Sequence, residues 1–224
     1  MLERYATRFD ATEINSSFYR PHQRKTYARW ADSVPPDFRF SVKLPKSISH
    51  ELRLQRCAGP LDRFLGETDG LGSKLAGILV QLPPSMAFEA RVAATFFAML
   101  RRRTDVAIAC EPRHPSWFGP GAVSLFERHA INRVAADPAL CADAARPGAY
   151  GSWRYWRWHG SPRIYYSDYP EAALSELATQ ARRDARSEAT PWIIFDNTAH
   201  GHATANAARL QQLLSASARQ KGNR

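Results

Sequence analysis

Residues 105–118 combine a buried strand pattern with side chains that can do chemistry. Aliphatic residues alternate with alanines at the start of this segment, which predicts a buried strand. The strand leads into Glu111, Arg113, His114 and Trp117, and Pro112 and Pro115 stop it and stiffen the loop. A hydrophobic strand that ends in an acid, a base, an imidazole and an aromatic ring is typical of α/β enzyme sites. The alternative is a polar loop with a structural ion pair.

Other predicted strands end in the same way, because side chains alternate between the two faces of a strand. In residues 38–44 the aromatic and aliphatic side chains form one row that suits packing against outer helices, which leaves Arg39, Ser41 and Lys43 facing the axis of a barrel. The groups predicted near strand ends are Glu13, Asn15, Lys43, Gln81, Glu111, Asp137, Arg157, His159 and Asp196. Buried charges are costly unless paired, so we favour a convergent ligand site over a packed network of structural ion pairs.

The same alternation assigns three further orientations. Trp156 and Trp158 should pack outward against helices, because they alternate with Arg157 and His159. Asp137 shares its row with Arg133 and Ala135, and we expect this row to face inward. Both rows of the last strand are apolar, and there we favour Asp196 inward.

The elements that must position these groups alternate along the chain. Strands are predicted at residues 11–18, 38–44, 75–82, 106–111, 133–137, 155–160 and 192–197, and helices at 2–9, 26–33, 58–71, 88–103, 122–130, 171–186 and 203–214. This order predicts an α/β fold with a parallel sheet, and we expect a TIM (β/α)8-type barrel that lacks its first strand. A doubly wound open sheet is the alternative, although no Gly-x-Gly-x-x-Gly follows any strand. We expect one domain over residues 1–214 and a polar tail at 215–224.

Composition narrows the class of protein. The 224 residues include three widely spaced cysteines, Cys57, Cys110 and Cys141, which suggest a reducing compartment without disulfides. Neither a membrane-spanning apolar run nor a signal-peptide pattern is present, so we expect a cytoplasmic protein without a membrane partner. The net charge of +10 lies largely on helix-like segments and leaves a nucleic-acid partner open.

Several ordered motifs resemble those of domain-of-unknown-function family 72, also called YecE-like. They are TEINSSFY at 12–19, FSVKLP at 40–45, QLPP at 81–84, EPRHPSW at 111–117, RWHGSP at 157–162 and DNT at 196–198. The resemblance covers nearly the whole chain and implies a TIM barrel but no particular reaction. Family members usually begin with a further strand that carries a Gly-Thr-Ser-Gly-Trp-like motif. This chain starts at the helix that would follow that strand, which agrees with the seven strands predicted above. We therefore expect an incomplete gene model or a truncated chain.

Three kinds of chemistry compete with our preferred function. Glu111, Asp137, His159 and Asp196 could bind a divalent metal, as in phosphodiesterases that resemble endonuclease IV, although those use more histidines. Lys43 could form a Schiff base with a carbonyl substrate. Glu13 and Glu111 could act as paired carboxylates on a glycoside.

We favour anion recognition by Lys43, Arg113 and Arg157 with His159 as acid or base. The predicted function is hydrolase- or lyase-like chemistry on a small anionic, phosphate-bearing substrate, with no metal assigned and any cofactor unknown. A non-catalytic nucleic-acid-binding protein is the competing class. We assign catalysis to Glu111, His159, Glu13 and Lys43. Substrate binding is assigned to Asn15, Gln81, Arg113, His114, Trp117, Asp137, Arg157, Tyr166, Asp196 and Asn197.

Overall fold

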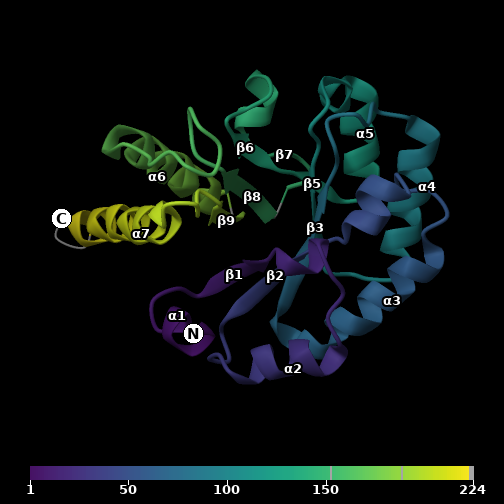
Figure 1. Ribbon diagram of the computed structural model, residues 1–224. Coiled ribbons are helices and arrows are strands. Elements are labelled where there is room, and N and C mark those ends of the chain that lie inside the picture. The colour runs from purple at the N-terminus through teal and green to yellow at the C-terminus, as the bar shows by residue number, and fades with distance from the viewer. Residues whose placement is uncertain (152, 188, 222–224) are drawn as a thin grey trace. The chain divides into compact units, whose positions relative to one another are not determined.

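The computed structural model of the chain describes residues 1–151, 153–187 and 189–221. Parallel strands alternate with helices, so the α/β class predicted from the sequence is confirmed (Figure 1). The chain divides into two compact units, Met1–Arg133 and Val134–Arg224. That residues 1–214 form a single domain stays a prediction.

The first unit contains strands β1 to β5, which run parallel and lie side by side in sequence order. Helices α3, α4 and α5 lie along one side of this sheet (Figure 1). The elements are α1 (Leu2–Ala6), β1 (Ala11–Ile14), η1 (Ser16–Phe18), α2 (Arg24–Asp32), β2 (Arg39–Lys43), η2 (Ser47–Glu51), α3 (Ala58–Thr68), η3 (Asp69–Lys74), β3 (Leu75–Gln81), α4 (Ala90–Arg101), β4 (Ala107–Glu111), η4 (Pro115–Phe118), α5 (Pro120–Arg128) and β5 (Ile131–Arg133).

Helix α4 shows why these segments fold as they do. Its buried residues Ala93, Phe96, Phe97 and Leu100 recur at the spacing of one helical face. The Phe97 ring meets Phe126 of α5 edge to face at a centroid distance of 5.7 Å. Burial of this aromatic stripe therefore holds two of the helices together.

The second unit contains strands β6, β8 and β9, again parallel, with β8 in the middle. Helices α6 and α7 lie side by side and both contact β9 (Figure 1). The elements are β6 (Ala135–Asp137), η5 (Ala142–Ala145), β7 (Gly148–Ala149), β8 (Trp153–Trp158), α6 (Glu171–Arg186), β9 (Thr190–Phe195) and α7 (His202–Lys221).

The core of the second unit forms between its sheet and α6. Leu174, Leu177 and Ala178 of α6 pack with Trp156 of β8 and Phe195 of β9, and the half-buried Trp158 packs against the same cluster. The prediction that both tryptophans face helices is therefore confirmed. Asp196 follows Phe195 and points to the opposite face, as expected.

Two predicted strands differ from those observed. The strand expected at residues 11–18 ends at Ile14, and a 3-10 turn follows in which the Ser17 hydroxyl lies 2.6 Å from the Lys43 carbonyl oxygen. The strand expected at 133–137 breaks at Val134, because β5 pairs with β4 whereas β6 pairs with β8. Propensity within one segment cannot reveal such a change of pairing partner.

The edges of the two sheets bear on the barrel expected from the sequence. Among the described strands, neither sheet closes into a barrel.

Helix α7 continues to Lys221, past the predicted end at residue 214, because neither Gly nor Pro interrupts residues 203–221. Residues 222–224 of the expected tail lie outside the described part. None of the described helices has the length and hydropathy to cross a membrane. A cytoplasmic location stays a prediction.

Candidate functional site

The first unit places four of the predicted groups on one face of its sheet. Glu13 pairs in register with Ser41, and Gln81 pairs with Glu111. Lys43 lies two residues beyond Ser41 and therefore shares its face. Lys43, Gln81 and Glu111 are the last residues of β2, β3 and β4, so these polar groups end neighbouring parallel strands.

Lys43 is buried beside aromatic rings. Its ammonium nitrogen lies 4.1 Å from the centre of the Phe18 ring, close enough for a cation–π interaction. The Phe18 ring also meets His50 edge to face at 4.9 Å. Burial lowers the pKa of His50, and the nearby charge of Lys43 lowers it further. The cation–π contact with Phe18 stabilises the charged form of the Lys43 side chain, whereas a Schiff base requires the neutral amine.

Glu111 is almost completely buried and forms an ion pair with Arg113, which is partly exposed. A buried carboxylate needs such a partner because its desolvation is costly. This ion pair gives a structural reason for the charges at positions 111 and 113 that involves no ligand.

The two remaining residues of this segment have structural roles. The His114 side chain accepts a hydrogen bond from the Ser116 backbone nitrogen at the start of η4. Trp117 is fully buried, its indole nitrogen donates to the Met86 carbonyl at 2.8 Å, and its ring stacks on Phe126. Trp117 therefore packs in the core of the first unit, and substrate binding by this residue stays a prediction.

The second unit builds a compact acid–imidazole–guanidinium cluster. Asp196 Oδ2 lies 3.1 Å from His159 Nδ1 and 3.3 Å from Arg157 Nη2. The register explains this geometry, because Trp158 pairs with Phe195 and the next residues of each strand, His159 and Asp196, follow side by side. His159 and Arg157 are buried, whereas the Asp196 side chain is 18% exposed.

Asp137 lies on the other face of the same sheet. It pairs in register with Trp158, and its carboxylate accepts a 2.7 Å hydrogen bond from the Tyr169 hydroxyl. Burial raises the pKa of Tyr169, and the bond to Asp137 raises it further. The inward orientation predicted for Asp137 is thus wrong: Asp137 shares a row with Ala135, as expected, but this row packs toward the helices, and Arg133 lies in a different strand.

Asn197 is also buried and ties loops to α7. Its amide nitrogen donates to the Ser167 carbonyl at 2.9 Å and to Asn206 Oδ1 at 2.8 Å, and Asn206 in turn donates to Asp168. Asn206 was not among the predicted residues. The signal that could have revealed it is a single amide on the buried side of an alanine-rich helix.

Three further residues predicted to bind substrate, Tyr166, Asn15 and Gln81, differ in exposure and contacts. Tyr166 is exposed, and its ring lies under the Arg163 guanidinium at 4.0 Å and beside His200. Asn15 follows β1, and its side-chain oxygen is buried without a hydrogen-bond donor among the described residues. Gln81 ends β3 next to Glu111.

The sequence predicts that six residues meet at one end of the fold: Glu13, Lys43, Glu111, Asp137, Arg157 and His159. The structure brings the first three to one face in the first unit and Arg157 and His159 together in the second, whereas Asp137 lies on the opposite face of the second sheet. That both groups form one site stays a prediction. In the described part of the chain, no three His, Cys, Asp or Glu side chains are arranged to hold a metal ion.

Comparison with known proteins gives a consistent family. The family model for "Protein of unknown function DUF72" matches residues 1–224. The chain is 28% identical to UPF0759 protein YecE of Escherichia coli K12 over 151 residues, which are 65% of this chain and 55% of that protein. It is 27% identical to UPF0759 protein YunF of Bacillus subtilis over 128 residues, 53% of this chain and 44% of that protein. The chain thus spans about half the length of the curated relatives that it matches.

Two solved structures share the fold. A DUF72 family protein from Enterococcus faecalis superposes with a TM-score of 0.82 at 22% identity, covering 96% of this chain and 93% of that one. A DUF72 family protein from Thermotoga maritima gives 0.77 at 24% identity, covering 92% and 85%.

Proposed function

This chain belongs to the DUF72 family of proteins of unknown function, and we propose from the geometry of its second unit that it is an enzyme. It performs acid/base chemistry of the hydrolase or lyase type on a small anionic substrate. The observation that carries the proposal is the 3.1 Å contact between His159 Nδ1 and Asp196 Oδ2. A carboxylate at one ring nitrogen is the arrangement that prepares a histidine for proton transfer at the other.

The chemistry follows from the donor and acceptor roles. An ionised carboxylate only accepts, so Nδ1 of His159 carries the proton in this hydrogen bond. The neutral imidazole then has a basic Nε2, which is the atom that exchanges a proton with the substrate. Asp196 also stabilises the imidazolium that forms when Nε2 takes up a proton.

Recognition of the anion is assigned to guanidinium and ammonium groups. Arg157 lies beside the dyad, with Nη2 3.3 Å from Asp196 Oδ2. Its planar fork matches the oxygens of a phosphate or carboxylate. Anion recognition by Lys43 and Arg113 of the first unit stays a prediction from the sequence.

Access to His159 requires movement of the loop that follows β8. The imidazole is buried, the Tyr165 backbone nitrogen donates to the His159 carbonyl, and the Tyr165 ring centre lies 6.1 Å from the imidazole. Tyr165 has φ of 70°, a conformation that is unfavourable for a residue with a side chain. We propose that residues 161–168 open to admit substrate and close to exclude water.

We also propose that the architecture is the TIM (β/α)8 type predicted from the sequence. Parallel strands followed by helices within each unit support this proposal. The position of the dyad after the carboxyl ends of β8 and β9 supports it too, because barrel enzymes place their catalytic groups there.

The test measures turnover of p-nitrophenyl phosphate and bis(p-nitrophenyl) phosphate by the wild type, His159→Gln and the matched control His200→Gln. His200 is exposed and lies in the same unit. We expect His159→Gln to lose turnover by about a hundredfold or more, as for removal of an acid/base group, and His200→Gln to retain it. Equal turnover in all three proteins would contradict the role of His159. Salt-sensitive nucleic-acid binding without turnover of any phosphate ester would favour the non-catalytic class instead.

A further inference from the structure

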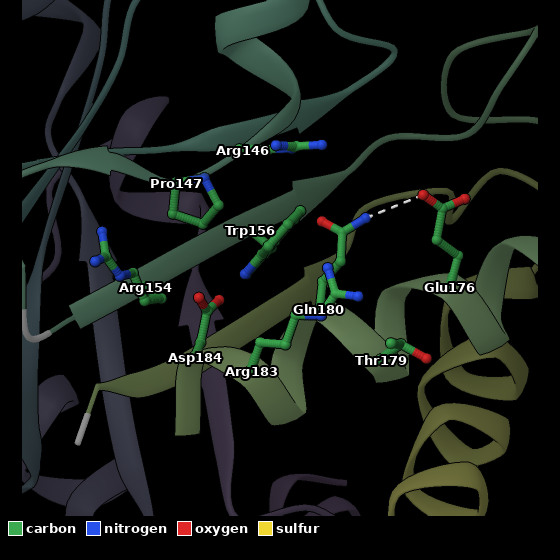
Figure 2. A pocket seen from close by; sticks show the side chains of 9 residues that line it. All are labelled: Arg146, Pro147, Arg154, Trp156, Glu176, Thr179, Gln180, Arg183 and Asp184. Atoms are coloured by element: carbon green, nitrogen blue, oxygen red, sulfur yellow. Dashed lines mark hydrogen bonds between the residues drawn. The ribbon is translucent and has the colours of Figure 1, made fainter. Parts of the chain in front are cut away.

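A pocket lies in the second unit on the helix-facing side of its sheet, away from the acid–imidazole cluster. It has a volume of about 350 Å³, within the range of small-molecule sites. Figure 2 shows the side chains that line it: Arg146, Pro147, Arg154, Trp156, Glu176, Thr179, Gln180, Arg183 and Asp184. They come from β8, from α6 and from the segment before β7.

Cations dominate this pocket. Arg146, Arg154 and Arg183 contribute three guanidiniums, against two carboxylates from Glu176 and Asp184. Within the described residues, none of the three arginines forms an ion pair. A concave surface with an excess of guanidiniums over carboxylates attracts an anion, and guanidinium forks bind phosphate oxygens in pairs.

Buried donors in the pocket also lack acceptors. Trp156 is only 3% exposed, and its indole N–H has no hydrogen-bond partner among the described residues. The Nε of Arg154 is buried and unpartnered as well. Buried polar groups are normally hydrogen-bonded, and both of these groups can only donate. A ligand group made only of acceptors, such as a phosphate, would satisfy both.

The remaining lining residues point to hydroxyl groups on the ligand. Asp184 Oδ2 is a buried acceptor without a donor in the described part, and Glu176 accepts from Gln180 at 3.2 Å, the dashed line in Figure 2. Thr179 also lines the pocket, and its hydroxyl donates to the Ser175 carbonyl at 3.0 Å. These acceptors suit a ligand that carries hydroxyl donors in addition to its anionic group.

We propose that this pocket binds a small hydroxylated phosphate ester of the sugar-phosphate type. The phosphate lies against Arg154, Arg183 and the Trp156 N–H. Hydroxyl groups of the ligand face Asp184 and Glu176. The site is separate from the His159 dyad, because Trp156 and Arg157 are neighbours on β8 and point to opposite faces.

The test is calorimetric titration of the full chain with glucose 6-phosphate, with inorganic phosphate and glucose as further probes. Arg183→Gln removes a pocket guanidinium from the exposed side of α6 without disturbing the core. Arg186→Gln is its control, because Arg186 lies on the same helix, is exposed and does not line the pocket. We expect Arg183→Gln to weaken the affinity for glucose 6-phosphate about tenfold or more, as for loss of a hydrogen bond to a charged group. Arg186→Gln should leave the affinity unchanged.

Three results would overturn the proposal. They are no binding of glucose 6-phosphate at millimolar concentration, equal weakening by Arg183→Gln and Arg186→Gln, and binding of inorganic phosphate as tight as that of the ester. Titration of His159→Gln separates the two sites: retained affinity supports an independent pocket, and lost affinity assigns the ester to the dyad and contradicts it.

Discussion

At the residue scale, Asp196 is the group that organises the second unit's cluster. One carboxylate oxygen serves both the imidazole of His159 and the guanidinium of Arg157. Since Arg157 is 1% exposed, its charge depends on partners inside the protein. Asp196 is therefore important for stability as well as for the proposed chemistry.

We expect Asp196→Asn to lower the free energy of unfolding by about 3 kcal/mol, because it removes a charged partner of the buried Arg157 guanidinium. Urea denaturation of the purified chain measures this loss. The control is Glu171→Gln, which breaks an ion pair with Arg209 between exposed side chains and should change stability little. Equal effects of the two substitutions would show that Asp196 does not hold a buried charge.

The pKa of His50 depends on the charge of Lys43. Its pKa is lowered first by burial and second by Lys43, so Lys43→Met should raise the pKa of His50 and Lys43→Arg should keep it low. Proton NMR titration of the histidines measures this. The pKa of His129, lowered by burial and by two arginines, serves as the internal reference and should stay unchanged. An unchanged His50 in Lys43→Met would contradict the placement of the ammonium.

The same shift predicts a pH dependence of stability. The ordinary pKa of histidine is 6.5, and folding lowers that of His50. As the pH falls through 6.5, the unfolded chain therefore takes up this proton before the folded chain does, and stability decreases. Lys43→Met should make this decrease smaller.

At the element scale, the alternation of side chains predicted the strand face on which a residue lies better than it predicted the residue at which a strand ends. Trp156 and Arg157 fall on the faces that alternation assigns, because each row packs against a different environment. Asp137 shows the limit: alternation gives its row, but the direction of that row depends on pairing with β8, which is not local in the sequence. The turn that ends β1 at Ile14 depends in the same way on Ser17 reaching Lys43 of the neighbouring strand.

Trp156 should be the more costly of the two outward tryptophans to remove. It is 3% exposed in the core beneath α6, whereas Trp158 is half-buried. We expect Trp156→Ala to cost about 3–5 kcal/mol and Trp158→Ala less, because the cost follows the buried volume that is lost. Urea midpoints of the two variants measure the order, and the reverse order would contradict the packing described for β8.

The candidate site could be predicted only in part. Glu13, Lys43, Gln81 and Glu111 follow from strand periodicity, since each lies on the polar row of a predicted strand. Trp117 could not be recognised as a core residue, because its hydrogen bond to Met86 links segments far apart in the sequence. The arginine-lined pocket was missed for the same reason: Arg146, Arg154 and Arg183 come from separate elements.

At the scale of the whole molecule, the net charge of +10 raises the question of nucleic acids. Arg182 and Arg209 already serve internal contacts, with Leu213 and Glu171 respectively. We therefore expect DNA to bind only through general electrostatic attraction, with affinity that falls steeply as salt rises. Fluorescence anisotropy with a labelled duplex across a salt series measures this. Tight binding that persists at physiological salt would instead indicate a dedicated nucleic-acid surface.

The central claim is that Asp196 orients His159 so that Nε2 performs acid/base chemistry. The most direct measurement is two-dimensional ¹⁵N–¹H NMR of the side-chain nitrogens of His159 at a pH where the imidazole is neutral. We predict the tautomer protonated at Nδ1, with loss of that preference in Asp196→Asn, because a neutral amide no longer requires a donor. A neutral imidazole protonated at Nε2 in the wild type would contradict the account.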